Sequence, residues 1–184
     1  NLKDPTLAKL EVRLALSQAT DRKTLNEKVL NSANIVSTTW MPPARSGTNP
    51  TAYDAAIGFD PVKAKANLKK AGYDNGAGFP KITVLQTDSA GNKAIGEFLQ
   101  SEWKKHLNID ITLEYTDSKT RSARFNSGDF QIVLGGWGED YPDPENWILG
   151  LYETGGSINK QSCSMKAIDD VIAKAKFNQK DEER

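Results

Sequence analysis

Residues 82–115 read ITVLQTDSAGNKAIGEFLQSEWKKHLNIDITLEY, and this stretch decides the fold class. Its first four residues, 82–85, form a short apolar and β-branched run of the kind found in strands. Residues 91–107 predict an amphipathic helix, because large apolar side chains recur at three- and four-residue spacing: Ile95, Phe98, Leu99 and Trp103. Residues 109–115 alternate apolar and polar side chains, which predicts a second, half-exposed strand. This order of elements is typical of an α/β fold.

The same alternation of elements continues towards the C-terminus. Residues 118–126 predict a short helix closed by Gly128, and residues 131–136 predict a third strand, which we expect to be buried. The order strand–helix–strand–helix–strand predicts a mixed sheet flanked by helices. The length of 184 residues allows one α/β domain with a real core and leaves two small domains open.

Three Asp-Pro pairs, which begin at Asp4, Asp60 and Asp143, each predict the start of a helix. The acidic side chain can cap free N–H groups, and proline suits the first helical position because its missing N–H costs nothing there. The helices expected outside the central stretch cover residues 5–19, 21–30, 60–72, 143–152 and 164–176. Residues 33–51 contain several prolines together with Trp40, which predicts a long irregular connection.

Composition and charge exclude several functional classes. Hydrophobic residues make up 38% and charged residues 26% of the sequence, which is typical of a globular domain rather than a disordered or membrane chain. Lysine plus arginine and aspartate plus glutamate both number 24, so the formal net charge is +0. That balance gives no electrostatic footprint for nucleic acid or for an anionic membrane, and neither is expected as a partner. No apolar run approaches the roughly 20 residues that span a bilayer.

Catalysis by histidine or cysteine is not expected. His106 is the only histidine, and its place at the end of a helix predicts a capping or surface residue. Cys163 is the only cysteine, so the sequence has no internal disulfide and no cysteine cluster for a metal. A thiol nucleophile would also need a nearby base, for which His106 is the sole candidate. We therefore predict no cofactor and no metal.

The functional stretch is predicted at residues 131–147, which read QIVLGGWGEDYPDPENW. The predicted strand ends in Gly135 and Gly136, where glycine allows close approach of a ligand or an unusual backbone angle. Aromatic and acidic side chains follow at once. In open α/β sheets, ligands bind at the carboxyl ends of the strands, so this stretch is a candidate binding site.

Four acids crowd into this stretch, and two of them have an expected local role. Asp143 is expected to cap a helix, and Glu145 in the first helical turn suits the helix dipole. Glu139 and Asp140 are left without a local role. The aromatic residues beside these two acids are Trp137 and Tyr141. A carboxylate beside aromatic rings fits a cationic group, because the acid supplies charge and the rings supply cation–π attraction.

Two other hypotheses remain open on the residues alone. A carbohydrate-active enzyme needs two carboxylates about 5–10 Å apart across a bound sugar, and Glu139 with Asp140 is the candidate pair. Alternatively, the chain is a docking or structural domain whose acidic loop is solvated surface. Trp147 is expected in the core, whereas Trp40 either anchors its loop or faces a partner.

Several segments, taken in order, carry a resemblance to a known family. They are Val12-Arg13-Leu14-Ala15-Leu16-Ser17 with Asp21-Arg22-Lys23, Met41-Pro42-Pro43, Phe59-Asp60-Pro61 with Ala71-Gly72-Tyr73, Leu107-Asn108-Ile109, Gly128-Asp129-Phe130, and Gly136-Trp137 with Asp140-Tyr141 and Asp143-Pro144. This ordered set resembles the oligopeptide- and dipeptide-binding type (family 5) of extracellular solute-binding proteins, which serve ATP-binding-cassette importers. The resemblance covers nearly the whole chain, and the ordered set is more specific than any one motif.

The resemblance implies a fold, a function and partners. The implied fold is one lobe of a periplasmic-binding-protein-like (type II) structure. We expect residues 1–184 to form this single α/β lobe, excised from a longer two-lobed protein and lacking the N-terminal lobe. The implied function is non-enzymatic capture of peptides or similar amine-bearing solutes in a cleft between two lobes. The solute would pass to the membrane permease subunits of the importer. The implied location is extracytoplasmic, either in the periplasm or on a lipid anchor at the outer face of the cell membrane.

The resemblance also implies roles for single residues. Asp140 stands at the position whose aspartate pairs with the α-ammonium group of the ligand. Trp137 would line the same pocket, with Tyr141 as a further ligand contact. The backbone of Gly135 and Gly136 would border the ligand.

One position departs from the pattern of peptide-binding members. Some of these carry an arginine just before the two glycines, which contacts the ligand carboxylate, whereas Leu134 occupies the neighbouring place here. The length of the ligand therefore stays open. A carbohydrate-binding relative stays open as well, because some members of the family bind other solutes.

Overall fold

The computed structural model describes residues 1–43, 48–141 and 143–176 and contains a parallel three-stranded sheet. The strands are β1 (Ile82–Thr87), β2 (Ile111–Thr116) and β3 (Ile132–Val133), in the spatial order β2-β1-β3. In the β1 register, Ile82 lies opposite Ile111 and Val84 lies opposite Ile132. The predicted class, α/β with helices that flank a sheet, is confirmed, but the described strands pair in parallel rather than as the predicted mixed sheet, because a helix connects each strand to the next.

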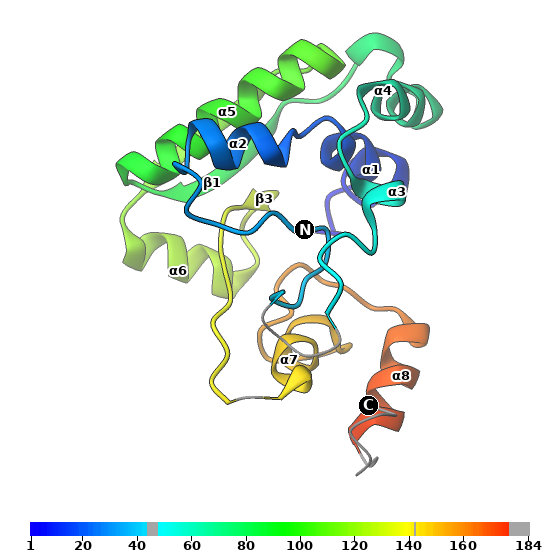
Figure 1. Cartoon of the computed structure of the whole chain (residues 1–184), viewed down its shortest axis with the longest axis vertical. Helices are drawn as coiled ribbons and strands as arrows, with labels where there is room; N and C mark the ends of the chain where they lie inside the picture. Colours follow the sequence, from blue (N-terminus) through cyan, green and yellow to red (C-terminus); the bar gives the residue numbers. More distant parts are fainter. Residues whose placement is uncertain (44–47, 142, 177–184) are drawn as a thin grey trace.

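Two helices connect the strands and cover opposite faces of the sheet. α5 (Ala90–Leu107) leads from β1 to β2, and α6 (Ser118–Ser127) leads from β2 to β3. Because β2 and β3 lie on opposite sides of β1, right-handed connections place these helices on opposite faces. Figure 1 shows α5 above the strands and α6 below them. The carboxyl ends of β1 and β3 therefore form a topological switch point, the place where open α/β sheets bind ligands.

Local sequence sets the ends of these two helices. The side chain of Ser89 accepts a hydrogen bond from the N–H of Asn92 at the start of α5. Asn108 ends α5 in the left-handed conformation, with a φ of 55°. Asp117 caps α6 by accepting from two backbone N–H groups, and Gly128 closes it with a φ of 77°. The stops predicted at Asn108 and Gly128 are confirmed.

The helices described before β1 are α1 (Leu10–Gln18), α2 (Arg22–Lys28), α3 (Asp54–Ile57) and α4 (Pro61–Lys70), and a 3-10 turn at Asp74–Gly76 follows them. Of these elements, α1 and α4 pack with α5 to form the core, whereas α2 and α3 have no buried residues. Leu16 of α1, Leu68 of α4 and Trp103 of α5 are all buried in one cluster with β1. The indole N–H of Trp103 donates to the carbonyl oxygen of Leu16 over 3.1 Å, which ties α5 to α1. Each fully buried side chain of this kind contributes roughly 1.5–3 kcal/mol.

The first helix starts later than the sequence predicts. α1 begins at Leu10 rather than Pro5, because Asp4 caps only a turn by accepting from the N–H groups of Thr6 and Leu7. The same Asp-Pro signal at Asp60 does start a helix, as predicted. A capping aspartate is therefore compatible with a turn as well as with a helix, and the residues that follow decide which of the two forms.

The third strand is shorter and less buried than predicted. The regular strand covers only Ile132 and Val133, although the N–H of Leu134 still donates to the carbonyl oxygen of Leu85 over 3.1 Å. Both strand residues are half-buried rather than buried. The reason is topology: β3 pairs with β1 on one side only, so it is an edge strand of the sheet.

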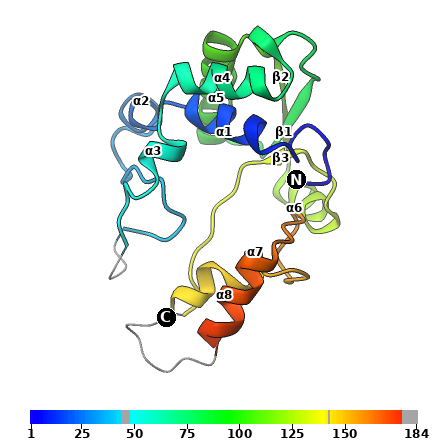
Figure 2. The ribbon, with the colours of Figure 1, turned by 90° about the vertical axis from the view of Figure 1, so that its right-hand side faces the viewer.

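A second group of short elements lies beyond the sheet. It comprises a 3-10 turn at Pro144–Trp147, α7 (Leu149–Tyr152) and α8 (Lys166–Lys176). Figure 2 shows the segment after β3 running from the sheet layer down to this group. The single helix predicted over residues 143–152 is wrong, because Ile148 leaves helical geometry with a φ of −121° and a ψ of −46°.

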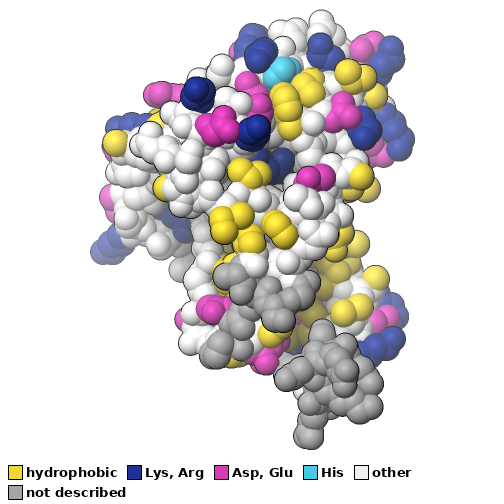
Figure 3. Space-filling model, viewed as in Figure 1, with side chains coloured by type: hydrophobic (Ala, Val, Ile, Leu, Met, Phe, Trp, Pro, Cys, Tyr) yellow, Lys and Arg dark blue, Asp and Glu magenta, His cyan; other side chains and the backbone are white. Residues whose placement is uncertain are grey.

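An apolar groove runs between α8 and the segment that carries Trp40. Val171 of α8 is 65% exposed, whereas Ile172 is buried. Both line the groove, together with Trp40 and Tyr152. Figure 3 shows hydrophobic side chains gathered where the surface hollows in this part of the molecule. The irregular connection predicted over residues 33–51 includes residues 44–47, which lie outside the described part of the chain.

Candidate ligand-binding site

A pocket opens at the carboxyl ends of β1 and β3, at the switch point of the sheet. Its lining residues are Thr87, Asn92, Ile95, Arg121, Leu134, Gly135 and Gly136. The side-chain amide of Asn92 donates to the carbonyl oxygen of Thr87 over 2.9 Å, which joins the start of α5 to the end of β1. Two of the residues predicted to contact a ligand, Gly135 and Gly136, thus lie at the pocket.

The two glycines matter for the room that their missing side chains leave, not for a strained backbone. A Cβ atom at residue 135 would lie 2.6 Å from Nη2 of Arg121, so Gly135 makes room for the end of this side chain beside β3. Nη2 of Arg121 also donates to the carbonyl oxygen of Leu134 over 2.7 Å. A Cβ atom at residue 136 would meet no atom within 4 Å, so Gly136 faces open space. Neither glycine has a positive φ, so of the two reasons for glycine at this strand end, close approach fits better than a left-handed backbone.

One buried amide, that of Asn146, orders the loop after the glycines. Its side-chain oxygen accepts the indole N–H of Trp137 over 2.9 Å and the backbone N–H of Asp140 over 3.1 Å. Asn146 is 9% exposed, so its polar atoms need protein partners. Sequence reasoning missed this residue, because an asparagine inside an expected helix gives no sign of partners six and nine positions away.

Asp140 presents its carboxylate at the surface of this ordered loop. The residue is exposed, and its backbone is held by Asn146. Within the described residues, the Asp140 carboxylate has no hydrogen bond or ion pair. Trp137 is half-buried on the same loop. The structure therefore brings Trp137 and Asp140 together through a shared partner.

The other acids of the loop have partners of their own. Glu139 accepts the indole N–H of Trp147 over 3.0 Å, so the prediction that Glu139 lacks a local role is wrong. Asp143 accepts the N–H of Glu145 over 2.9 Å, which confirms the predicted cap. The hydroxyl of Tyr141 donates to Glu145 over 2.9 Å, and this bond raises the pKa of Tyr141.

Two tryptophans hold the loop against the rest of the molecule. Trp147 is 7% exposed, which confirms its predicted place in the core. The indole N–H of Trp40 donates to the carbonyl oxygen of Trp147 over 2.6 Å, and the two rings meet edge to face at 6.2 Å. Trp40 therefore anchors its own segment to the elements that follow the site.

The remaining reactive residues lie away from this loop. His106 is packed rather than exposed: its ring lies 5.4 Å from that of Phe59, and its Nε2 lies 3.5 Å from the Glu102 carboxylate. Cys163 is buried, and burial raises the pKa of its thiol. Among the described residues, no group of three or more acidic, histidine or cysteine side chains could hold a metal ion. Nor does any helix in those ranges have the length and apolar character to cross a membrane.

The sheet thus has a pocket at its switch point, the place where open α/β sheets bind ligands, and the loop of Trp137 and Asp140 follows it. Residues 1–159 match the family model of bacterial extracellular solute-binding proteins, family 5 (middle). The chain belongs to this family, and the resemblance drawn from its sequence motifs is confirmed.

Individual relatives agree with the family model. The chain is 32% identical over 178 residues to the periplasmic murein peptide-binding protein MppA of Escherichia coli, covering 94% of this chain and 32% of the relative. It is 31% identical over 172 residues to di/tripeptide-binding protein 3 of Pseudomonas aeruginosa, covering 91% and 32%. A crystal structure of a periplasmic oligopeptide-binding protein from Borrelia burgdorferi superposes with a TM-score of 0.85 at 33% identity, covering 98% of this chain and 35% of that one.

The relatives are longer than this chain, and their names describe what they bind. The chain spans about a third of the length of the curated relatives that it matches. By their names, the relatives are binding proteins rather than enzymes.

Proposed function

We propose that this chain is a ligand-capturing lobe of the substrate-binding component of an ATP-binding-cassette importer and that it binds peptides or similar amine-bearing solutes. One observation carries the proposal: Asp140 offers an exposed carboxylate without a partner in the described residues, on a loop that Asn146 holds beside Trp137. A carboxylate forms charge-assisted hydrogen bonds with an α-ammonium group, and an indole ring adds cation–π attraction. The names of the relatives support a peptide as the solute.

The other predicted site residues complete the proposed contact surface. Gly135 and Gly136 border the pocket at the strand ends, where the ligand backbone approaches the chain. Tyr141 is 43% exposed, and its ring adds an aromatic surface next to Asp140 in the sequence. In this arrangement Asp140 fixes the amine of the solute, and the aromatic residues cover its apolar parts.

The ligand would be enclosed between this lobe and a second, N-terminal lobe of the same protein. The exposure of Asp140, Gly135 and Gly136 supports this, because a single lobe covers only one side of a bound solute. Membrane permease subunits of the importer would receive the solute. The extracellular family and the periplasmic relatives support an extracytoplasmic location, in the periplasm or on a lipid anchor at the outer face of the membrane.

Binding without catalysis fits the loop better than glycoside hydrolysis. The acid pair of a glycosidase would be Glu139 and Asp140, but Glu139 already accepts the indole N–H of Trp147. The relatives by name are binding proteins, and the carbohydrate-active alternative finds no support among them.

A retention experiment tests the proposed solute class. The protein that carries this chain with its second lobe would be incubated separately with a library of two- to five-residue peptides and with an oligosaccharide mixture. After gel filtration, mass spectrometry would identify what the protein retains. We expect retention of peptides with a free amine, and less of it in the Asp140→Asn variant. Retention of oligosaccharides alone, or release of cleaved sugars, would contradict the proposal.

A further inference from the structure

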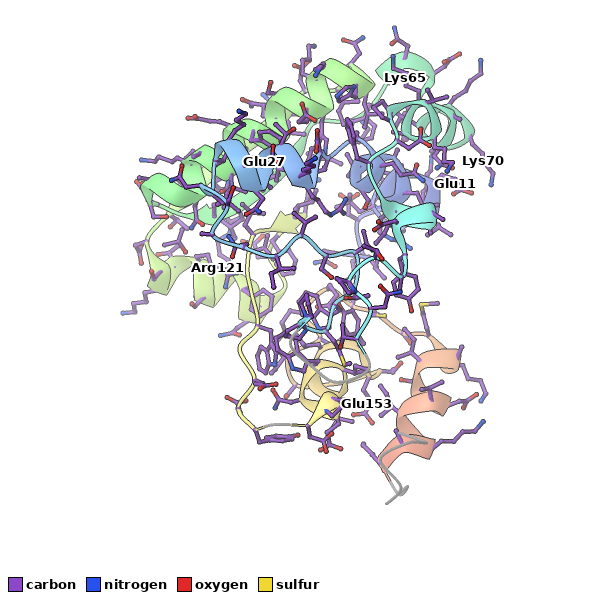
Figure 4. All side chains as sticks on the ribbon, in the orientation of Figure 1. Glu11, Glu27, Lys65, Lys70, Arg121 and Glu153 are labelled. Atoms are coloured by element: carbon purple, nitrogen blue, oxygen red, sulfur yellow. The ribbon has the colours of Figure 1, made fainter. Side chains whose placement is uncertain are left out.

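Arg121 places a guanidinium group at the end of β3, where no acidic residue of the described chain pairs with it. The residue belongs to α6 and is half-buried, and Figure 4 shows it beside the segment that leaves β3. One of its N–H groups donates to the carbonyl oxygen of Leu134 over 2.7 Å, and its guanidinium carbon lies 5.2 Å from the centre of the Phe125 ring. Within the described ranges, no carboxylate forms an ion pair with it.

Arg124, the next arginine on the same helix, differs from Arg121 because its charge is neutralised by acidic side chains. Arg124 pairs with Glu114 of β2 and, at 2.9 Å, with Asp129. These contacts satisfy its charge and raise the pKa of Arg124, chiefly through the hydrogen bond with Glu114. Arg121 and Arg124 are one turn apart, yet only Arg124 has its countercharge within the described chain.

The setting of Arg121 points to a ligand as its missing countercharge. The guanidinium lines the pocket at the switch point, beside Gly135 and Gly136. Gly135 is the residue whose missing Cβ makes room for Nη2 of Arg121. A guanidinium carries five N–H donors in a planar fork, so one bond to Leu134 leaves others for a second acceptor. A partly buried charge without a partner is costly, and a carboxylate is the acceptor that matches this fork best.

We propose that Arg121 binds an anionic group of the captured solute, a carboxylate, and so selects zwitterionic ligands. The inference rests on the proposed function and deepens it: Asp140 takes the ammonium group, and Arg121 takes the carboxylate. The hydrogen bond to Leu134 positions the fork, and the glycines leave the space that the carboxylate enters. The carboxylate comes either from the C-terminus of a peptide or from an acidic side chain, and the two sources can be separated.

The test compares peptides that differ only in their carboxylate. The tightest tripeptide with neutral side chains, found in a screen of free acids, would be titrated into the two-lobed protein by calorimetry. Its C-terminal amide would be titrated in parallel, and so would an amide with one glutamate side chain. Because a charge-assisted hydrogen bond is stronger than a neutral one, the wild type should bind the acid at least about tenfold more tightly than the neutral amide. A glutamate that restores the affinity of the amide identifies the side chain as an accepted source.

Variants at Arg121 decide whether this residue is responsible. In Arg121→Gln the preference for the free acid over the amide should shrink to within about twofold. In Arg121→Lys part of this preference should remain, because lysine keeps the positive charge without the planar fork. Lys119→Gln is the matched control, because it removes a positive charge from the same helix outside the pocket lining. It should leave the preference unchanged. Melting curves would check that each variant is folded.

The experiment separates a wrong assignment of Arg121 from a wrong proposed function. If the wild type binds the acid and the amide equally, or Arg121→Gln keeps the full preference, the assignment of Arg121 is overturned while peptide binding stands. If no peptide binds the wild type at all, the proposed function is overturned and this inference falls with it.

Discussion

The indole N–H of Trp137 donates a hydrogen bond to the side-chain oxygen of Asn146 over 2.9 Å. The same oxygen accepts the backbone N–H of Asp140, so one buried amide sets the positions of both residues that we propose to contact the ammonium group. Preorganisation of this kind lowers the cost of ordering the loop when a ligand binds. Asn146 is thus a positioning residue for the site.

Replacing Asn146 with alanine should weaken ligand binding without removing a ligand contact. Two N–H groups lose their acceptor, and each such bond contributes about 0.5–1.5 kcal/mol. We expect the free energy of unfolding to fall by roughly 1–3 kcal/mol and the peptide Kd to rise about tenfold. Urea unfolding and calorimetry on the same preparations measure the two effects.

Asn159→Ala is the control for a general loss of stability. The side chain of Asn159 also bridges backbone groups, accepting from Cys163 over 2.9 Å and donating to Glu153 over 2.9 Å. Within the described residues, the hydrogen bonds of its side chain go to Glu153 and Cys163 and not to the loop of Trp137 and Asp140. This variant should lose comparable stability and keep its affinity. Equal losses of affinity in both variants would show that Asn146 has no special role.

The aspartates that cap helices should make the protein sensitive to acid. At Asp117, hydrogen bonds from the hydroxyl and backbone N–H of Thr120 lower the pKa of the carboxyl group. At Asp21, burial alone would raise the pKa, but hydrogen bonds from Thr24 outweigh it and the pKa is lowered. A carboxyl whose pKa is lower in the folded state stabilises that state above its unfolded pKa of about 4. The contribution disappears as the pH falls through the folded pKa.

Urea unfolding as a function of pH measures this contribution. We expect little change in the free energy of unfolding from these groups between about pH 7 and pH 5, and a fall below about pH 4. The double variant Asp21→Asn, Asp117→Asn should fall less steeply, because asparagine keeps the cap but does not titrate. If the free energy of unfolding falls equally steeply with pH in the wild type and in the double variant, these two caps are not the source of the acid sensitivity.

Two glycines with the same backbone angle should respond differently to alanine. Gly76 and Gly128 both have a φ of 77°. At Gly128 a Cβ atom would lie 3.9 Å from the nearest atom, the carbonyl oxygen of Lys160, so Gly128→Ala should cost about 1–2 kcal/mol for the backbone alone. At Gly76 a Cβ atom would collide with the carbonyl oxygens of Leu107 and Asn108, so Gly76→Ala should cost roughly 1–3 kcal/mol more.

Thermal or urea unfolding of the two variants checks this ranking. Gly128→Ala serves as the control, because it carries the same conformational penalty without the collision. Equal losses of stability would contradict the close approach between the Gly76 turn and the end of α5.

Much of the fold was predictable from the sequence because its signals are local. The apolar spacing of α5, the alternation of β2 and the left-handed stops at Asn108 and Gly128 all depend on neighbouring residues. The shortened β3 was not predictable, since its half-burial follows from its edge position in the sheet. The late start of α1 was missed because a cap at Asp4 is compatible with a turn as well as a helix.

The candidate site was predictable only in part, because sequence patterns report on neighbouring residues and not on distant partners. Trp137 and Asp140 stand out in the sequence as an aromatic residue and an acid after a strand. Asn146 and Arg121, which shape the surroundings of Trp137 and Asp140, bond to residues that are not their neighbours in the sequence. Asn146 reaches back to both from the following turn, and Arg121 reaches Leu134 from α6. Such partners become visible only when the fold brings them together.

The most direct test of the account is a calorimetric comparison of one peptide with its N-acetylated form. Acetylation removes the ammonium group that we assign to Asp140 and leaves the rest of the peptide unchanged. The wild-type two-lobed protein should bind the free peptide about tenfold or more tightly than the acetylated one, and Asp140→Asn should lose this preference. Asp110→Asn should keep this preference, because Asp110 is an exposed aspartate just before β2 that pairs with Lys104 of α5. Equal binding of both peptides by the wild type, or an unchanged preference in Asp140→Asn, would contradict the account.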